Sequence, residues 1–120
     1  MKNITNIEQY LQYIHDIDVA IQMAKDELEY FKANNHSSES ERRILELENE
    51  IAQKIVDKCE FAIVCDKLTN EIHRTILKRR YILHQSYHQI AKHVYMCERS
   101  VAINHNKAVI ELASIIANNK

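Results

Sequence analysis

The chain of 120 residues contains no glycine and no proline. These residues normally make up about 7% and 5% of a protein, and tight hairpins between strands depend on residues that adopt a positive φ or preset a turn. A chain without either residue has few means of connecting neighbouring strands. The composition therefore predicts an all-α fold.

Long apolar runs are also missing. No stretch approaches the roughly 20 apolar residues of a transmembrane helix, and the first residues, MKNITNIEQY, lack the apolar segment of a secretory signal. The cysteines Cys59, Cys65 and Cys97 are odd in number and widely spaced, which favours reduced packing residues over a disulfide framework. We expect a cytoplasmic protein that does not associate with a membrane.

Signs of catalysis or metal binding are equally scarce. Zinc needs four ligands of defined geometry, and neither the histidines 84, 88 and 93 nor any cysteine pair has metal-finger spacing. A Cys–His couple would have no glycine-shaped site to supply an oxyanion hole. We expect neither an enzyme nor a cofactor or metal.

Charge is distributed unevenly along the chain. Residues 1–70 hold 8 Lys/Arg against 14 Asp/Glu, a balance of −6, whereas residues 71–120 hold 8 against 3, a balance of +5. Such a split predicts an acidic half that faces water or protein and a basic half that faces an anionic partner. Attraction between the two halves would also account for it.

The acidic half, residues 1–67, carries two amphipathic stripes with apolar residues at steps of three and four. Ser38 with Glu41 three residues later fits a capping box for the second helix. A short polar loop between two long helices predicts an antiparallel hairpin, which must cover its remaining apolar surface with the C-terminal half or with a second copy in a homodimer. The stripes are Ile7, Leu11, Ile14, Ile17, Ile21, Ala24, Leu28 and Phe31, then Ile44, Leu47, Ile51, Ile55, Cys59, Ala62 and Cys65.

The basic half, residues 68–120, predicts three shorter helices. Thr69 fits the cap of the first, and Ser86 with Gln89 fits a capping box for the second. The small Ala91 allows that helix to cross the next one closely, as a helix-turn-helix requires. The corner between them would place Tyr95 where glycine is commonest, so we expect a slightly wider turn there.

The stretch "ILKRRYI…SYHQIAKHV…ERSV…HNKAVIEL", Ile76 to Leu112, resembles region four of bacterial sigma factors, which reads the promoter −35 element. With acidic helices before it, the chain is similar to phage late-gene transcription regulators of the RinA and ArpU type. The resemblance implies a helix-turn-helix domain over residues 68–120 that binds double-stranded DNA in the cytoplasm of a bacterial host.

On this resemblance, the helix from Glu98 enters the major groove, and Arg99 is the best candidate for a bidentate guanine contact. Basic side chains around it would contact phosphates and supply affinity rather than sequence choice. The expected base-facing residues are Glu98, Arg99, Ala102, Ile103 and Asn106, and the expected phosphate contacts are Arg79, Arg80, Lys92, Lys107, His88 and His105.

Three functions remain open at this point. The first is a DNA-binding regulator of phage or mobile-element transcription that acts beside host RNA polymerase. The second is a protein-binding module that inhibits RNA polymerase or another phage regulator. Cys97 as a poor helix cap, Tyr95 in the corner and the polar Asn104 at a normally apolar position favour this second function. The third is the DNA-recognition subunit of a small terminase, which ring-sized oligomers would indicate.

Overall fold

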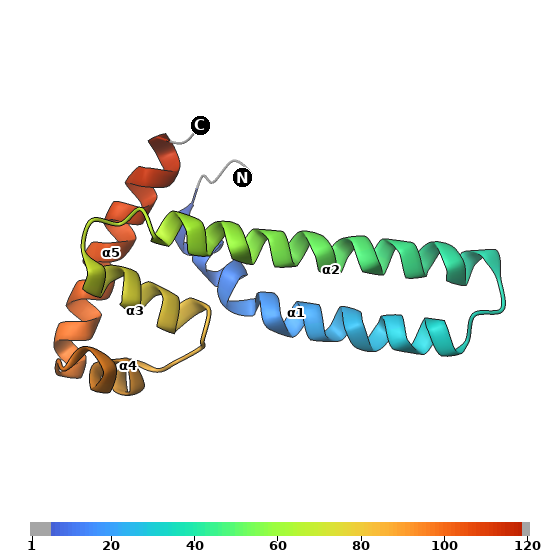
Figure 1. Cartoon of the computed structure of the whole chain (residues 1–120), viewed down its shortest axis with the longest axis horizontal. Helices are drawn as coiled ribbons and strands as arrows, with labels where there is room; N and C mark the ends of the chain where they lie inside the picture. The colour runs from blue at the N-terminus through green and yellow to red at the C-terminus, as the bar shows by residue number, and fades with distance from the viewer. Residues whose placement is uncertain (1–5, 119–120) are drawn as a thin grey trace.

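The computed structural model describes residues 6–118, which form five α-helices and no strand. They are α1 (Ile7–Ala33), α2 (Ser38–Cys65), α3 (Glu71–Tyr81), α4 (Tyr87–Val94) and α5 (Glu98–Asn118). The prediction of an all-α fold is confirmed. Helices α1 and α2 run side by side in opposite directions as a long rod, and α3, α4 and α5 gather at one end of it (Figure 1).

Helices α1 and α2 are joined by a short turn that is capped differently from the sequence prediction. The side chain of Ser37, not Ser38, caps α2, and Ser40 rather than Glu41 completes the capping box. Ser40 is buried in the turn and also bonds Asn35, so its short hydroxyl fits where a glutamate would not. The cap therefore lies one residue earlier than predicted.

The inward stripe of α1 follows the prediction, with Leu11, Ile14, Ile17 and Ala24 buried. In α2 the predicted stripe is wrong at Ile55, which is 47% exposed, and at Cys59, which is also exposed. Successive steps of four residues turn 40° more than a full circle each time, so Ile51, Ile55 and Cys59 drift off the inner face.

Lysines occupy the inner face of α2 where the apolar stripe leaves it. Lys58 donates to Asp18 of α1 at 2.6 Å, and Lys54 lies 5.8 Å from the ring centre of Tyr13. Their alkyl stems line the α1–α2 contact while their charges find partners on α1. The contact between the two long helices is therefore partly ionic, and a second face of α2 carries apolar residues outward.

The main core lies where the rod meets α3 and α5. It contains residues of α1 and α2, Leu68 from the connection after α2, and residues of α3 and α5. Both predicted segments, 1–67 and 68–120, therefore contribute to one continuous core. Its buried members are Leu11, Ile14, Phe61, Val64, Cys65, Leu68, Leu77, Tyr81, Ala108, Leu112 and Ile116.

The start of α3 also differs from the prediction by one residue. Asn70 caps the helix by accepting from the backbone N–H groups of Ile72 and His73. Thr69, the predicted cap, instead donates its hydroxyl to Glu111 of α5 at 3.1 Å. The amide oxygen of asparagine is among the best N-caps, so the adjacent residue takes the role.

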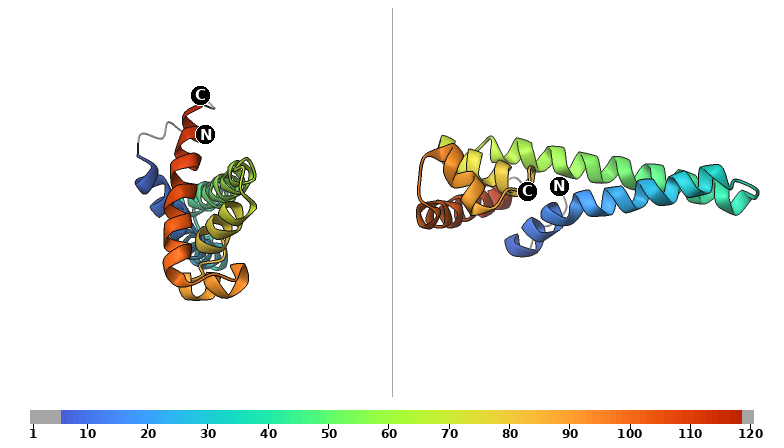
Figure 2. Two further views of the ribbon diagram at one scale, coloured as in Figure 1. Left: turned by 90° about the vertical axis from the view of Figure 1, so that its left-hand side faces the viewer. Right: turned by 90° about the horizontal axis from the view of Figure 1, so that it is seen from below.

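Helix α5 is the long element of the C-terminal half. It crosses the end of the rod, and the short α4 lies against its first turns (Figure 2). Over residues 6–118, no helix is long and apolar enough to cross a lipid bilayer.

Candidate nucleic-acid interface

Helix α4 begins as the sequence predicts. The Ser86 side chain accepts from the Gln89 backbone N–H, and the Gln89 side chain accepts from the Ser86 backbone N–H. The two bonds satisfy two backbone donors that a helix start otherwise leaves unpaired. The predicted capping box is confirmed, and it sets the residue at which α4 begins.

The turn after α4 is tighter than expected. Tyr95 adopts the left-handed region, with φ 56° and ψ 45°, so the expectation of a wider turn is wrong. The Met96 N–H bonds the Ala91 carbonyl at 3.2 Å, which is the long bond of a Schellman motif. The left-handed backbone costs about 1–2 kcal/mol without glycine. Tyr95 is 95% exposed, so its ring adds no clash with packed residues to that backbone cost.

A small second core holds α4 and α5 against α3. Ile76, Ile90 and Val101 are fully buried in it, and Ala91 is 9% exposed. Met96, in the turn, is partly buried against the same cluster. The position of the α5 start is thus set by apolar packing on both sides of the turn, and the small Ala91 lies in that packing as predicted.

The first turn of α5 is organised around Cys97. Its thiol lies 3.3 Å from the Ser100 hydroxyl, and the Cys97 carbonyl accepts from the Val101 N–H. Hydrogen bonding by Ser100, first its side chain and then its backbone N–H, lowers the pKa of the exposed Cys97 thiol. Glu98 adds a negative charge at this helix start, where the helix dipole favours one.

Asn104, which stands at a normally apolar position, is fully partnered. Its side-chain amide donates to the Ser100 carbonyl at 2.9 Å, and its side-chain oxygen lies 3.0 Å from Nε2 of His73. The residue therefore ties α5 to α3 by a polar contact. A half-buried asparagine with partners on both sides costs little and fixes the rotation of α5.

The outer surface of α4 and of the first turns of α5 carries most of the predicted contact residues. Arg99, Asn106 and Lys107 are exposed on α5, and Ile103 is 46% exposed among them. The remaining members are exposed Glu98, half-buried Ala102 and, on α4, exposed His88 and Lys92. The imidazole of His88 lies 3.9 Å from the Glu98 carboxylate, which brings the surfaces of α4 and α5 together.

Arg79 and Arg80, at the end of α3, are engaged within the fold. Arg80 donates to the Gln85 carbonyl at 3.1 Å, and its guanidinium lies 5.1 Å from the ring centre of Tyr87. Arg79 donates to the Gln85 side chain at 3.4 Å. Both side chains are half-buried, so they hold the α3–α4 connection and leave only part of each guanidinium facing solvent.

His105 does not belong to this surface, which corrects its prediction as a phosphate contact. It is 9% exposed, and its Nε2 lies 2.7 Å from the Tyr81 hydroxyl. Burial lowers the pKa of its imidazole; the hydrogen bond to Asn106 opposes this shift, and nearby Arg80 adds to it. A neutral ring with its proton on Nδ1 accepts from Tyr81 and donates to Asn106, so both contacts are explained.

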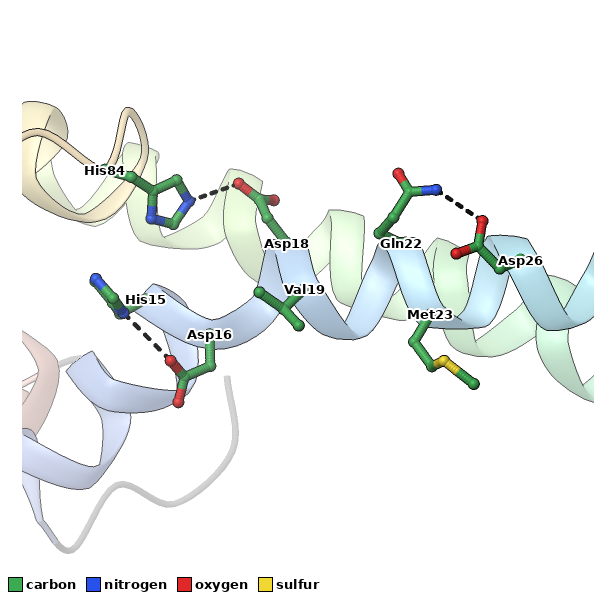
Figure 3. A pocket seen from close by; sticks show the side chains of 8 residues that line it. All are labelled: His15, Asp16, Asp18, Val19, Gln22, Met23, Asp26 and His84. Carbon is green, nitrogen blue, oxygen red and sulfur yellow. Dashed lines mark hydrogen bonds and ion pairs between the residues drawn. The ribbon is translucent and has the colours of Figure 1, made fainter.

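A second surface feature, not predicted from the sequence, is an open groove of about 560 Å³ along α1 (Figure 3). His84, held in the left-handed region at φ 57°, donates to Asp18 at 2.7 Å across one end of it. Burial opposes the charge of Asp18, but the bonds from Lys58 and His84 outweigh it and lower its pKa. The groove is lined by His15, Asp16, Asp18, Val19, Gln22, Met23, Asp26 and His84.

The groove brings α1 and the α3–α4 connection together, which is why the sequence did not reveal it. The only local signal is a pair of outward apolar residues, Val19 and Met23, which are 74% and 63% exposed among acidic neighbours.

In residues 6–118 no group of three or more His, Cys, Asp or Glu side chains is placed to hold a metal ion. Comparison with protein-family models, curated proteins and solved structures found no match to this chain.

Proposed function

We propose that this protein is a DNA-binding transcription regulator of phage or mobile-element genes that acts beside host RNA polymerase. In this proposal α4, residues 95–97 and α5 are a helix-turn-helix, and α5 is the helix that enters the major groove. The observation that carries the proposal is the exposed Arg99 in the first turn of α5. The position of this helix start is fixed by two packed cores and by the capped helix α4 before it.

The proposed contacts divide into two kinds. Arg99 and Asn106 face base edges, since a guanidinium matches guanine and a side-chain amide matches adenine. Lys92 and Lys107 neutralise phosphates at the rim of the same surface. All four side chains are exposed, and none of the three cationic ones has an ion-pair partner within residues 6–118. The Asn106 side-chain oxygen also lies 3.4 Å from Nδ1 of His105, a contact that leaves its NH2 group for a base.

The test is a fluorescence-anisotropy titration with duplexes from upstream of the operons that neighbour its gene. We expect tighter binding to one duplex, and Arg99→Ala should reduce that preference by about 1–3 kcal/mol. The matched control is Lys25→Ala, which removes one exposed positive charge from α1 and should leave the preference unchanged. Equal binding to all duplexes by the wild type would contradict sequence reading.

The alternative function, a protein-binding module that inhibits a regulator or RNA polymerase, is favoured by two exposed apolar residues on α5. Ile103 is 46% exposed and Ile110 is 72% exposed, seven residues apart on one helix. A protein partner would cover such side chains, whereas a DNA backbone would not. A folded protein that binds no duplex at moderate salt but retains RNA polymerase in a pull-down would support this alternative.

A further inference from the structure

The outward face of α2 carries a regular row of residues that nothing in residues 6–118 covers. Leu45, Val56 and Ile63 are 62%, 46% and 59% exposed, and the residues between them on the same face are exposed as well. The row advances by steps of four, three, four, three and four. It consists of Leu45, Asn49, Ala52, Val56, Cys59 and Ile63, and we call it the α2 seam.

The spacing of the α2 seam is the 3.5-residue period of a coiled coil. In heptad terms Asn49, Val56 and Ile63 occupy a positions, and Leu45, Ala52 and Cys59 occupy d positions. A single asparagine at an a position is a known device that fixes register at some cost in stability. The opposite face of the helix packs on the rest of the chain, so the seam is a second apolar surface on one helix.

We propose that the α2 seam pairs with the same seam of a second copy of this chain, as an antiparallel two-helix coiled coil. With the two-fold axis at residue 54, Leu45 meets Ile63 of the second copy, and Asn49 meets Cys59. At the centre Ala52 meets Val56. Each layer joins an a residue to a d residue, as antiparallel pairing requires, and the interface is isologous.

The seam is complementary to itself about this axis. The small Ala52 faces the larger Val56, so the helices can approach closely at the centre. Ile55 lies beside the axis and is 47% exposed, which brings it against Ile55 of the second copy. This contact explains why an isoleucine at the side of the seam stays uncovered in the single chain.

Charges at the ends of the seam select the antiparallel orientation. Arg42 and Asp66 continue the heptad one step beyond each end, and both are exposed, at 76% and 60% of their side chains. Within the single chain Arg42 lies 3.9 Å from Glu46 and Asp66 pairs with Lys78 of α3, so each would share its charge with the second copy. Antiparallel pairing puts Arg42 opposite Asp66 of the second copy. Parallel pairing would put Arg42 opposite Arg42 and Asp66 opposite Asp66, so that like charges would meet. Opposed helix dipoles favour the same orientation. Glu46 then lies near Glu60 of the second copy, where solvent screens the repulsion.

The first test is the solution mass of the full chain by sedimentation velocity over a range of concentrations. The wild type should have twice the single-chain mass of 14.2 kDa. Val56→Lys should shift it to the single-chain mass, and the matched control Val19→Lys, which changes an exposed valine on α1, should remain double. Circular dichroism checks that both variants stay helical. A wild type of single-chain mass at every concentration, or a Val56→Lys variant that stays double, overturns the proposal.

The second test reads the orientation through disulfide crosslinking in a Cys97→Ser background, which leaves Cys59 as the one exposed thiol among residues 6–118. Antiparallel pairing separates the two Cys59 side chains, so mild oxidation should give no covalent dimer. Asn49→Cys in the same background should give one readily, because position 49 faces Cys59 of the second copy. Strong crosslinking without Asn49→Cys would mean parallel pairing and would overturn the proposal.

The pairing does not depend on the proposed function. The mass and the crosslinks are measured without DNA, so a failure of DNA binding leaves them interpretable. Conversely, a single-chain mass together with sequence-specific DNA binding would reject the α2 seam alone and retain the regulator.

Discussion

At the scale of single residues, Tyr95 is one of two residues of the C-terminal half, with His84, that hold a left-handed backbone without glycine. The residue adopts φ 56° with a side chain that is 95% exposed, so the ring contributes almost no packing to offset the strain. Tyr95→Gly should therefore stabilise the protein by about 1 kcal/mol, because glycine enters the left-handed region without steric cost. Urea denaturation followed by circular dichroism measures it.

Tyr95→Ala is the control for that substitution, since it removes the ring and keeps the Cβ that causes the strain. Its free energy of unfolding should stay close to that of the wild type. If alanine stabilised the protein as much as glycine, the effect would come from the exposed ring and not from the backbone.

His105 should make stability depend on pH. Burial lowers the pKa of its imidazole in the folded chain, while the unfolded chain keeps the ordinary value near 6.5. Below that value the unfolded chain binds more protons, so the free energy of unfolding should fall as pH drops from 7 toward 5. His105→Gln, which retains an acceptor for Tyr81, should flatten this slope. Denaturation curves at several pH values measure it, and an unchanged slope in the variant would contradict this role.

At the scale of helices, Phe61 is the largest fully buried side chain, in a core that α1, α2, α3 and α5 all share. Phe61→Ala should cost about 3–5 kcal/mol, because it removes buried area and leaves a cavity. Since both halves contribute to this core, the loss should appear as one shifted transition and not as separate melting of the rod. The measurement is denaturation followed at two wavelengths, far-ultraviolet for helix and near-ultraviolet for tyrosine.

Val19→Ala is the matched control for that core substitution, because Val19 is 74% exposed on α1. It should change the free energy of unfolding by less than about 0.5 kcal/mol. Two well-separated transitions in Phe61→Ala, with one half intact, would show that the halves are held by independent cores.

At the scale of the whole molecule, the proposed binding to DNA should depend steeply on salt. Each phosphate contact contributes about −0.9 to the slope of log K against log salt concentration. Lys92→Ala should therefore reduce the magnitude of the slope by about one and weaken binding to every duplex alike. Anisotropy titrations at several salt concentrations measure both quantities. A change in preference between duplexes with an unchanged slope would assign Lys92 to base reading instead.

The sequence was informative where the decisive interactions are local. The absence of glycine and proline indicated helices throughout, the inward stripe of α1 was read correctly, and the Ser86–Gln89 capping box stands as predicted. The composition acts at every position, and the stripe and the capping box depend on side chains within about one helical turn of each other, so their spacing carries the information. The caps of α2 and α3 were each wrong by one residue, because Ser37 and Asn70 compete with neighbours of similar chemistry.

The features that only the tertiary structure decided depend on contacts between residues that are distant in the sequence. His105 reads as a surface cation until Tyr81, 24 residues earlier, is seen to bond it in the core. Ile55 and Cys59 read as core residues until the path of α1 shows that they face outward. A helical stripe records which residues are apolar but not which side another helix covers. The sequence alone therefore determined the helices and their caps to within a residue, and packing decided which surfaces remain free for a partner.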